Sequence, residues 1–239
     1  MSSLPVPSPL RRRWFLFKTP VDETLTASAV FSCLLVALRV MHTGRPTFIF
    51  MPWNLFLAYV PYFVSSWLTR PGRRLRPVVK AIGLAGWLLF IPNSFYILTD
   101  LYHLADGHRD ARVPEWYDLV LILSFALSGT LIAVMSTRQI EGLILPRAGF
   151  RGRWAFLFPL MFLNALGVYL GRYLRYNSWD IFTNPVDLAA DICGMILHPL
   201  HHPNAWGMIG CYSILLSLIY NLLTKITDHG KYDRANLEP

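Results

Sequence analysis

Residues 117–136 read YDLVLILSFALSGTLIAVMS, and Asp118 is the one charged residue among them. A helix needs about 20 mostly apolar residues to cross the hydrocarbon core of a bilayer. The stretch therefore predicts a membrane-spanning helix.

Five further stretches have comparable length and composition. The first of them is the weakest, because Ser and Thr interrupt it and Arg39 lies near its end. Together with 117–136 they predict an all-α fold, a polytopic membrane helix bundle of about six transmembrane helices. The five stretches are Leu25–Met41, Phe48–Leu68, Val78–Leu98, Trp154–Leu174 and Trp206–Leu223.

The composition of the whole chain agrees with a membrane protein. Of 239 residues 54% are hydrophobic and 15% are charged, against about 25% charged in ordinary soluble domains. The mean hydropathy is +0.39. The three cysteines, Cys33, Cys193 and Cys211, form neither a disulfide framework nor a zinc-knuckle spacing.

The basic residues predict the orientation of the spans. Sixteen of the 22 Lys and Arg residues fall on the side that holds both termini, five fall on the other side, and Arg39 lies within a span. By the positive-inside rule we predict a multi-pass protein of the plasma membrane with both termini cytoplasmic. We accordingly predict a cytoplasmic N-terminal tail (1–23), a six-helix transmembrane domain (24–224) and a cytoplasmic C-terminal tail (225–239). The net charge of +8 then reflects topology and contact with the lipid bilayer, and no nucleic acid is expected as a partner.

One apolar segment is too short to span. Asn184–His198 (NPVDLAADICGMILH) opens with an Asn cap followed by proline, and Pro199 ends it. We predict a short interfacial or re-entrant helix on the outer side. At 100° per residue Asp187, Asp191 and His198 share one face, and the apolar residues lie elsewhere.

Small residues mark two sites of close helix packing. Gly167 and Gly171 form a small-xxx-small pair in the fifth span, and Ser124, Ser128 and Gly129 form a similar stripe in the fourth. Such pairs let a neighbouring helix approach closely.

Polar residues gather at the outer ends of the spans. Asp100 and His103 end the third span, Asp118 begins the fourth, and Arg172 and Arg175 end the fifth, three apart on one face. Asn93 and Asp100 are seven residues apart, which places them on one helix face with Tyr96 between them. Ionisable groups at membrane depth are costly and are usually paired or functional. Any site is therefore expected to face outward.

Three stretches carry a resemblance: PNSFYILTDLYH, VPEWYDLVLILSFALSG and YLGRYLRYNSWDIFTNP. They are similar to the uncharacterised bacterial integral membrane protein family known as domain of unknown function 1361, over roughly Asn54 to Leu223. The family form of the first motif is PNAPY, and Ser94 and Phe95 replace its Ala-Pro here. The resemblance implies a polytopic membrane protein and transfers no catalytic role to any residue.

Two interpretations of the group Asp100, Asp118, Arg172 and Arg175 stay open. One is an ion-pair network that locks the helices together. The other is an outward-facing pocket in which the arginines bind the anionic headgroup of a lipid or envelope precursor. The candidate ligand-binding residues are Asn93, Tyr96, Arg172, Arg175, Asn177, Trp179 and Asp180.

An enzymatic alternative is a hydrolase or transferase for a lipid-linked substrate, with Asp100, His103 and Asp118 as candidate catalytic residues. His198 and His202 are weak candidates for a divalent metal, since Pro199 interrupts the helix that their spacing assumes. A small transporter is the third hypothesis. The sequence assigns neither a reaction, nor a cofactor, nor an oligomeric state, and we rank accessory binding first, enzyme second and transport third.

Overall fold

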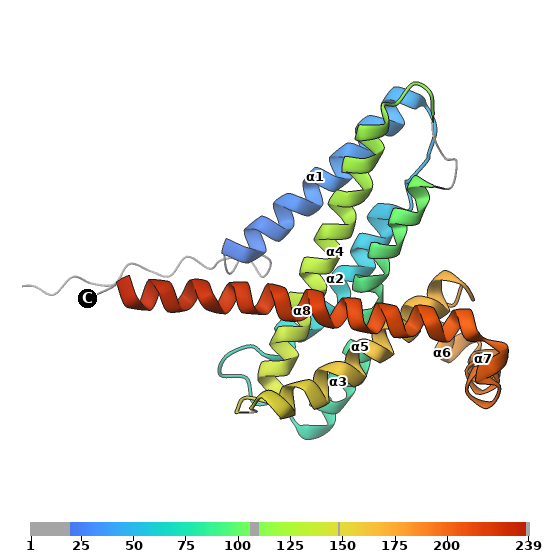
Figure 1. Ribbon diagram of the computed structural model, residues 1–239. Coiled ribbons are helices and arrows are strands. Elements are labelled where there is room, and N and C mark those ends of the chain that lie inside the picture. Colours follow the sequence, from blue (N-terminus) through green and yellow to red (C-terminus); the bar gives the residue numbers. More distant parts are fainter. Residues whose placement is uncertain (1–19, 106–109, 148, 238–239) are drawn as a thin grey trace, which may run out of the picture.

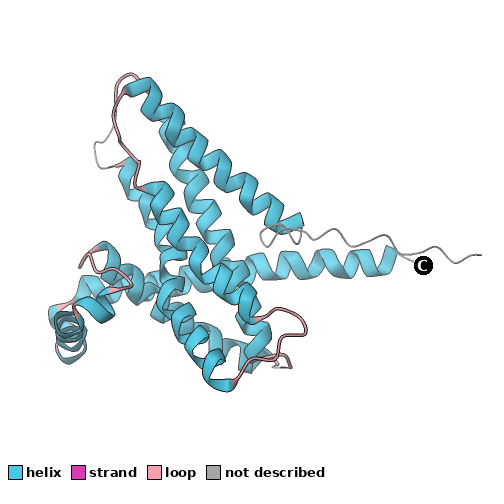
Figure 2. Ribbon diagram, turned by 180° about the vertical axis from the view of Figure 1, so that it is seen from behind, coloured by secondary structure: helices cyan, strands magenta, loops and turns pink. Residues whose placement is uncertain are grey.

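The structure is a computed structural model that describes residues 20–105, 110–147 and 149–237. Within these ranges the chain forms helices joined by loops, and no strand occurs among them (Figure 2). The all-α prediction is confirmed. The helices, with 3-10 helices marked η, are α1 (Pro20–Thr43), α2 (Met51–Leu68), α3 (Pro77–Tyr96), η1 (Ile97–Leu104), α4 (Glu115–Ile144), α5 (Phe150–Arg172), α6 (Asp180–Thr183), α7 (Pro185–Leu197), η2 (Pro199–His201) and α8 (Pro203–Leu237).

Two pairs of neighbouring long helices run in opposite directions. Figure 1 shows α1 beside α4 and α5 beside α8, each pair antiparallel. Five helices of the described chain are long and apolar enough to cross a membrane, namely α1, α3 continued by η1, α4, α5 and α8. The chain is thus a polytopic helical bundle.

Helix α2, predicted as the second of six spans, is in the bundle but falls outside this set of five, whereas the first span, predicted to be the weakest, belongs to the set. Its polar side chains bond to neighbouring helices: Tyr59 donates to the Leu25 carbonyl at 2.9 Å, and Ser65 lies 2.9 Å from Ser136. Because α2 packs between α1, α3 and α4, partners inside the protein replace the lipid that an exposed span would face.

The core has three clusters that share helices. One joins α1, α2, η1 and α4 around Met51 and Phe125, and a second joins α2, α3, α4, α5 and α8 around Ile91 and Met161. A third, around Ile209, attaches α7 to α5 and α8. Helices α2 and α4 take part in both large clusters and so connect them.

Both predicted close-packing stripes are confirmed. A Cβ on Gly167 would lie 2.7 Å from Pro92 Cβ, and one on Gly129 would lie 2.9 Å from the Ser94 carbonyl oxygen. Ser128 lies 2.6 Å from Ser28 of α1. Helix α3 therefore approaches both α4 and α5 at positions where only glycine fits without a shift.

The predicted boundaries differ from the structure at the chain ends. Helix α1 begins at Pro20, and α8 continues to Leu237, through most of the predicted C-terminal tail. The first part of the predicted N-terminal tail, residues 1–19, lies outside the described residues. The predicted short helix forms as α7, starting after Asn184, although the Asn184 side chain makes no capping hydrogen bond.

Candidate ligand-binding cavity

A cavity of about 1000 Å³ lies between α2, α3, α5 and α7. The predicted residues Asn93, Tyr96, His103, Arg172, Arg175 and Asn177 all line it, although they come from separate parts of the sequence. We call His103, Arg172, Arg175 and Asn177 the polar end of the cavity. The apolar part is lined by Leu57, Ala85, Leu88, Leu89 and Leu163.

Two contacts between α3 and the segment after α5 shape the cavity wall. Asn93 donates its side-chain amide to the Phe90 carbonyl at 3.0 Å and to Ser178 Oγ at 2.8 Å, and Ser178 donates to the Leu89 carbonyl at 3.2 Å. Pro92 cannot donate a backbone hydrogen bond, which leaves the carbonyl of Leu88, four residues earlier, without its helical donor. Sequence reasoning missed Ser178, although it lies in one of the motifs that carry the family resemblance. Its hydroxyl joins that motif to the one that contains Asn93.

Asp100 lies directly behind the polar end. Its side chain is fully buried, Asn54 donates to Oδ2 at 3.2 Å, and Arg172 Nη1 lies 3.6 Å from Oδ1. Asp100 itself does not line the cavity. From Ile97 the helix tightens to 3-10 geometry, so Asp100 lies in η1, whereas Asn93 and Tyr96 lie in α3.

His103 and Arg172 make the central contact of the polar end. Arg172 Nη1 lies 3.2 Å from His103 Nε2, and that nitrogen is 3.9 Å from Asp100 Oδ1. A guanidinium group has only donors, so Nε2 accepts this hydrogen bond. The shorter contact therefore joins histidine to arginine, and Asp100 acts as the counter-ion of Arg172.

Arg175 and Arg172 reach the cavity by different routes. Helix α5 ends at Arg172, and Arg175 follows in a loop with a left-handed backbone (φ 61°), so the two do not share one helical face as predicted. Arg172 is 15% exposed at its side chain, while Arg175 is exposed and makes no hydrogen bond or ion pair with the described residues. One guanidinium is held in place and the other is available at the cavity edge.

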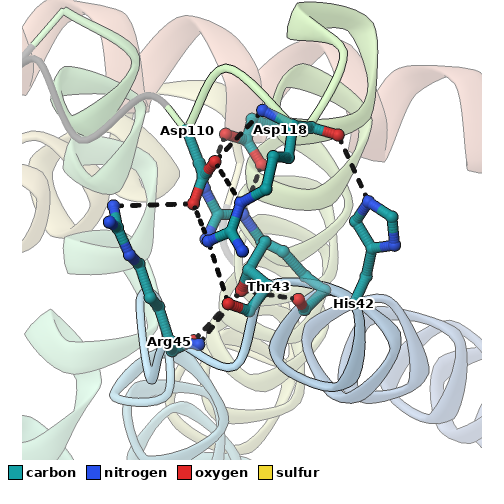
Figure 3. A network of polar contacts seen from close by, with 7 residues as sticks. His42, Thr43, Arg45, Asp110 and Asp118 are labelled. Atoms are coloured by element: carbon teal, nitrogen blue, oxygen red, sulfur yellow. Dashed lines mark hydrogen bonds and ion pairs between the residues drawn. The ribbon is translucent and has the colours of Figure 1, made fainter.

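Asp118 does not belong to this site. It accepts two hydrogen bonds from Arg39 of α1, from Nε at 2.6 Å and from Nη2 at 2.9 Å (Figure 3). The predicted group of Asp100, Asp118, Arg172 and Arg175 is therefore not one network: Asp100 pairs with Arg172, Asp118 pairs with Arg39, and Arg175 makes no ion pair with the described residues. Sequence reasoning counted Arg39 within a span without assigning it a partner, although a charge at that depth requires one.

Phe48 lies between the two pairs. Its ring stacks on the Arg39 guanidinium, 4.7 Å from ring centroid to Cζ, and its centroid is 6.4 Å from that of His103. The residue is buried and has φ 65°, a left-handed conformation that is strained for a bulky side chain. The strain is tolerated where the ring covers Arg39.

The remaining predicted ligand residues have local roles. Asp180 accepts from the Asn177 backbone at 2.6 Å and from Thr183 at 2.8 Å, which lowers its pKa. Trp179 precedes α6 and is 39% exposed, and neither it nor Asp180 lines the cavity.

The two candidate metal ligands are not neighbours on one helix. His198 follows the last residue of α7, and the 3-10 turn η2 separates it from His202. The His198 ring stacks on His201, with centroids 5.5 Å apart. In the described parts of the chain, no three His, Cys, Asp or Glu residues form a group suited to a metal ion.

A loop network closes the bundle near Asp118. Arg112 binds Asp110 through two hydrogen bonds of 2.7 and 2.9 Å and donates to the Thr43 carbonyl at 2.9 Å, and Arg45 lies 3.5 Å from Asp110 (Figure 3). These cations hold the pKa of Asp110 well below its usual range. The network fastens the loop before α4 to the end of α1.

The helices define the class: a polytopic helical membrane protein. The family can be stated as well. Residues 53–219 match the family described as protein of unknown function (DUF1361), and the chain belongs to that family, which confirms the resemblance. Neither the curated proteins nor the solved structures gave a match.

Proposed function

We propose that the protein binds an amphiphile with an anionic headgroup, such as a lipid or a lipid-linked envelope precursor, in the cavity between α2, α3, α5 and α7. The proposal rests above all on one observation: Arg172 and Arg175 both line one end of a large cavity whose other walls are mainly aliphatic. The charge count of the loops supports placing that end on the outer side.

The polar end has the chemistry of an anion site. Guanidinium groups bind phosphate and carboxylate through paired, charge-assisted hydrogen bonds. Asp100 neutralises Arg172 from behind and leaves Arg175 without a counter-ion among the described residues. The Asn177 side chain adds a further polar group at the same end. An incoming anion therefore supplies the missing negative charge.

The apolar part favours a ligand with a hydrocarbon chain. Leu57 of α2, Leu88 of α3 and Leu163 of α5 line it from three sides. Burial of each methylene group stabilises a complex by about 0.8 kcal/mol. A small hydrophilic anion would leave this surface without a partner.

Binding is better supported than catalysis. Of the three candidate catalytic residues, Asp118 is occupied by Arg39 and Asp100 lies behind the cavity wall. Only His103 reaches the cavity, and its Nε2 already accepts from Arg172. Transport remains the third hypothesis, without a specific observation in its favour.

Native mass spectrometry of the detergent-solubilised protein with added phosphatidic acid tests the proposal. Arg175→Gln removes the exposed guanidinium without leaving a buried partner behind. Because a hydrogen bond to a charged group contributes about 1.5–3 kcal/mol, we expect an affinity loss of roughly 10- to 100-fold. Phosphatidylcholine, which carries no net charge, should bind wild type and variant alike.

Arg74→Gln is the matched control, an exposed arginine in the loop between α2 and α3 that does not line the cavity. It should retain wild-type affinity for phosphatidic acid. Equal affinity of wild type and Arg175→Gln, or an equal loss in both variants, would overturn the proposal.

A further inference from the structure

Helix α7 has two separate apolar sides. Leu188, Ile192 and Met195 point into the protein, where the first two line the cavity and Met195 is 3% exposed. At 100° per residue Val186, Cys193 and the residues around them occupy a sector of about 120° on the opposite side. The members of this outer sector are exposed: Val186 (76%), Ile196 (59%) and Leu197 (72%), together with Ala189, Ala190 and Cys193.

The polar residues of α7 occupy only the narrow sector between these sides. Asp187 and Asp191 are one turn apart, and Tyr176 donates to Asp191 at 2.8 Å. This bond raises the pKa of Tyr176 to about 12. Apolar residues thus cover most of the circumference, a pattern unlike that of a helix that faces water on one side.

The position of α7 determines what covers its outer sector. It is joined to the ends of two spans, since α5 ends at Arg172 and α8 begins at Pro203, and Figure 1 places it beside those ends. Thirteen residues extend only about 20 Å, too short to cross a bilayer. The apolar outer sector continues in the exposed Phe182 and Leu200 on either side of the helix.

We infer that α7 lies in the membrane interface with its outer sector against lipid acyl chains, and that it forms the wall through which ligand enters the cavity from the bilayer. Leu188 and Ile192 line the cavity from the same helix whose far side meets the lipid. Few contacts hold the helix in place, among them Tyr176 to Asp191 and Trp206 Nε1 to the Met195 carbonyl at 3.2 Å. The access route rests on the proposed function, whereas the lipid contact of α7 does not.

Cys193 provides a natural probe of the lipid contact, because it is exposed at the centre of the outer sector. In a Cys33→Ser/Cys211→Ser background it is labelled with a fluorophore, and the full chain is reconstituted in phosphatidylcholine–phosphatidylglycerol vesicles. We expect strong quenching by lipids with spin-labelled acyl chains and weak quenching by aqueous iodide. In a background that also carries Cys193→Ser, Asp187→Cys places the label in the polar sector. This label should be quenched strongly by iodide and weakly by the spin-labelled lipids.

Two outcomes would overturn the lipid contact. Iodide quenching of Cys193 as strong as that of Asp187→Cys would place the outer sector in water. Protection from both quenchers would mean that protein, such as a second copy of the chain, covers it. If labelling of Cys193 disturbs folding, Val186→Cys in the same sector, with Cys193→Ser, gives the same comparison.

Competition tests the access route. Phosphatidic acid is bound from vesicles, and glycerol phosphate, which has the same headgroup without acyl chains, is added as competitor. We expect displacement only at a concentration on the order of 100-fold higher or more, because buried methylene groups dominate the affinity of a lipid. Displacement at equal concentration would overturn access from the bilayer. Failure of phosphatidic acid itself to bind would overturn both the route and the proposed function, and would leave the quenching result standing.

Discussion

The two buried arginine–aspartate pairs have the same chemistry and different surroundings. Arg39 and Asp118 form a bidentate pair whose side chains are 0% and 10% exposed, and Phe48 covers it. Arg172 and Asp100 approach only to 3.6 Å, and Arg172 also faces His103 and the cavity. The first pair is bidentate and buried, and Arg172 of the second pair lines the cavity. Under the proposed function the first pair locks two helices together and the second belongs to the binding site.

Breaking the Arg39–Asp118 pair should cause the largest loss of stability. Arg39→Met leaves Asp118 buried without its partner, and loss of one member of a buried pair costs about 3–5 kcal/mol. We expect the variant to fail to accumulate in membranes. Arg39→Met/Asp118→Leu, which removes both charges, should recover much of the accumulation measured by immunoblot. Normal accumulation of the single variant would contradict a locking role.

Crowding the contact between α3 and α5 should reduce the stability of the protein by an intermediate amount. Gly167→Ala places a methyl group 2.7 Å from Pro92 Cβ, and such overpacking costs about 1–3 kcal/mol. Gly86→Ala in α3 is the control, because nothing lies within 4 Å of its added Cβ. Thermal unfolding in detergent should place Gly167→Ala below wild type and Gly86→Ala at or slightly above it. Equal melting temperatures would contradict the close approach of α3 and α5.

Removing the hydrogen bond from Asn54 to Asp100 should reduce stability by a smaller amount. Asn54→Leu removes the 3.2 Å hydrogen bond to Asp100, which contributes about 1.5 kcal/mol for a charged acceptor. Arg172 keeps its counter-ion in this variant. We therefore expect reduced stability with phosphatidic acid affinity within a few fold of wild type, and abolished binding would mean that Asn54 acts on the ligand directly.

We expect the smallest change in stability from the loop network around Asp110 and Arg112. The pKa of Asp110 is lowered by Arg112, so its stabilisation is present above the usual value of about 4 and is lost as the pH falls further. Wild type should melt slightly above Asp110→Asn at pH 7, and the difference should disappear in strong acid. A difference that grows on acidification would have the wrong sign.

The helices and their close contacts follow from local sequence, whereas the partners of charged groups do not. Runs of apolar residues predicted the spans, and small residues predicted the contacts at Gly129 and Gly167. Helix α2 was predicted as a span like the others, although it falls outside the five helices that are long and apolar enough to cross a membrane. Composition alone does not reveal that its Tyr59 and Ser65 side chains bond within the protein.

The sequence predicted many of the residues that line the candidate site but few of their hydrogen-bond and ion-pair partners. Six of the ten candidate catalytic and ligand-binding residues line the cavity. Asp118 was grouped with Arg172 and Arg175 because all three residues were predicted at the same depth in the membrane. Depth alone does not determine which helices are neighbours. Asp100 lies in a 3-10 helix, and no residue pattern predicts the change from α to 3-10 geometry at Ile97. Asn54 and Ser178 were missed because each works through a distant segment.

One paired measurement tests the central claim that the two ion pairs have separate roles. Asp100→Asn/Arg172→Gln and Arg39→Gln/Asp118→Asn each neutralise a whole pair without leaving a charge unpaired. Melting temperature and phosphatidic acid affinity are measured on both. The account predicts that the first variant loses the lipid while melting near wild type, and that the second melts lower while its folded fraction binds normally. The reverse pattern, or the same change in both variants, would contradict it.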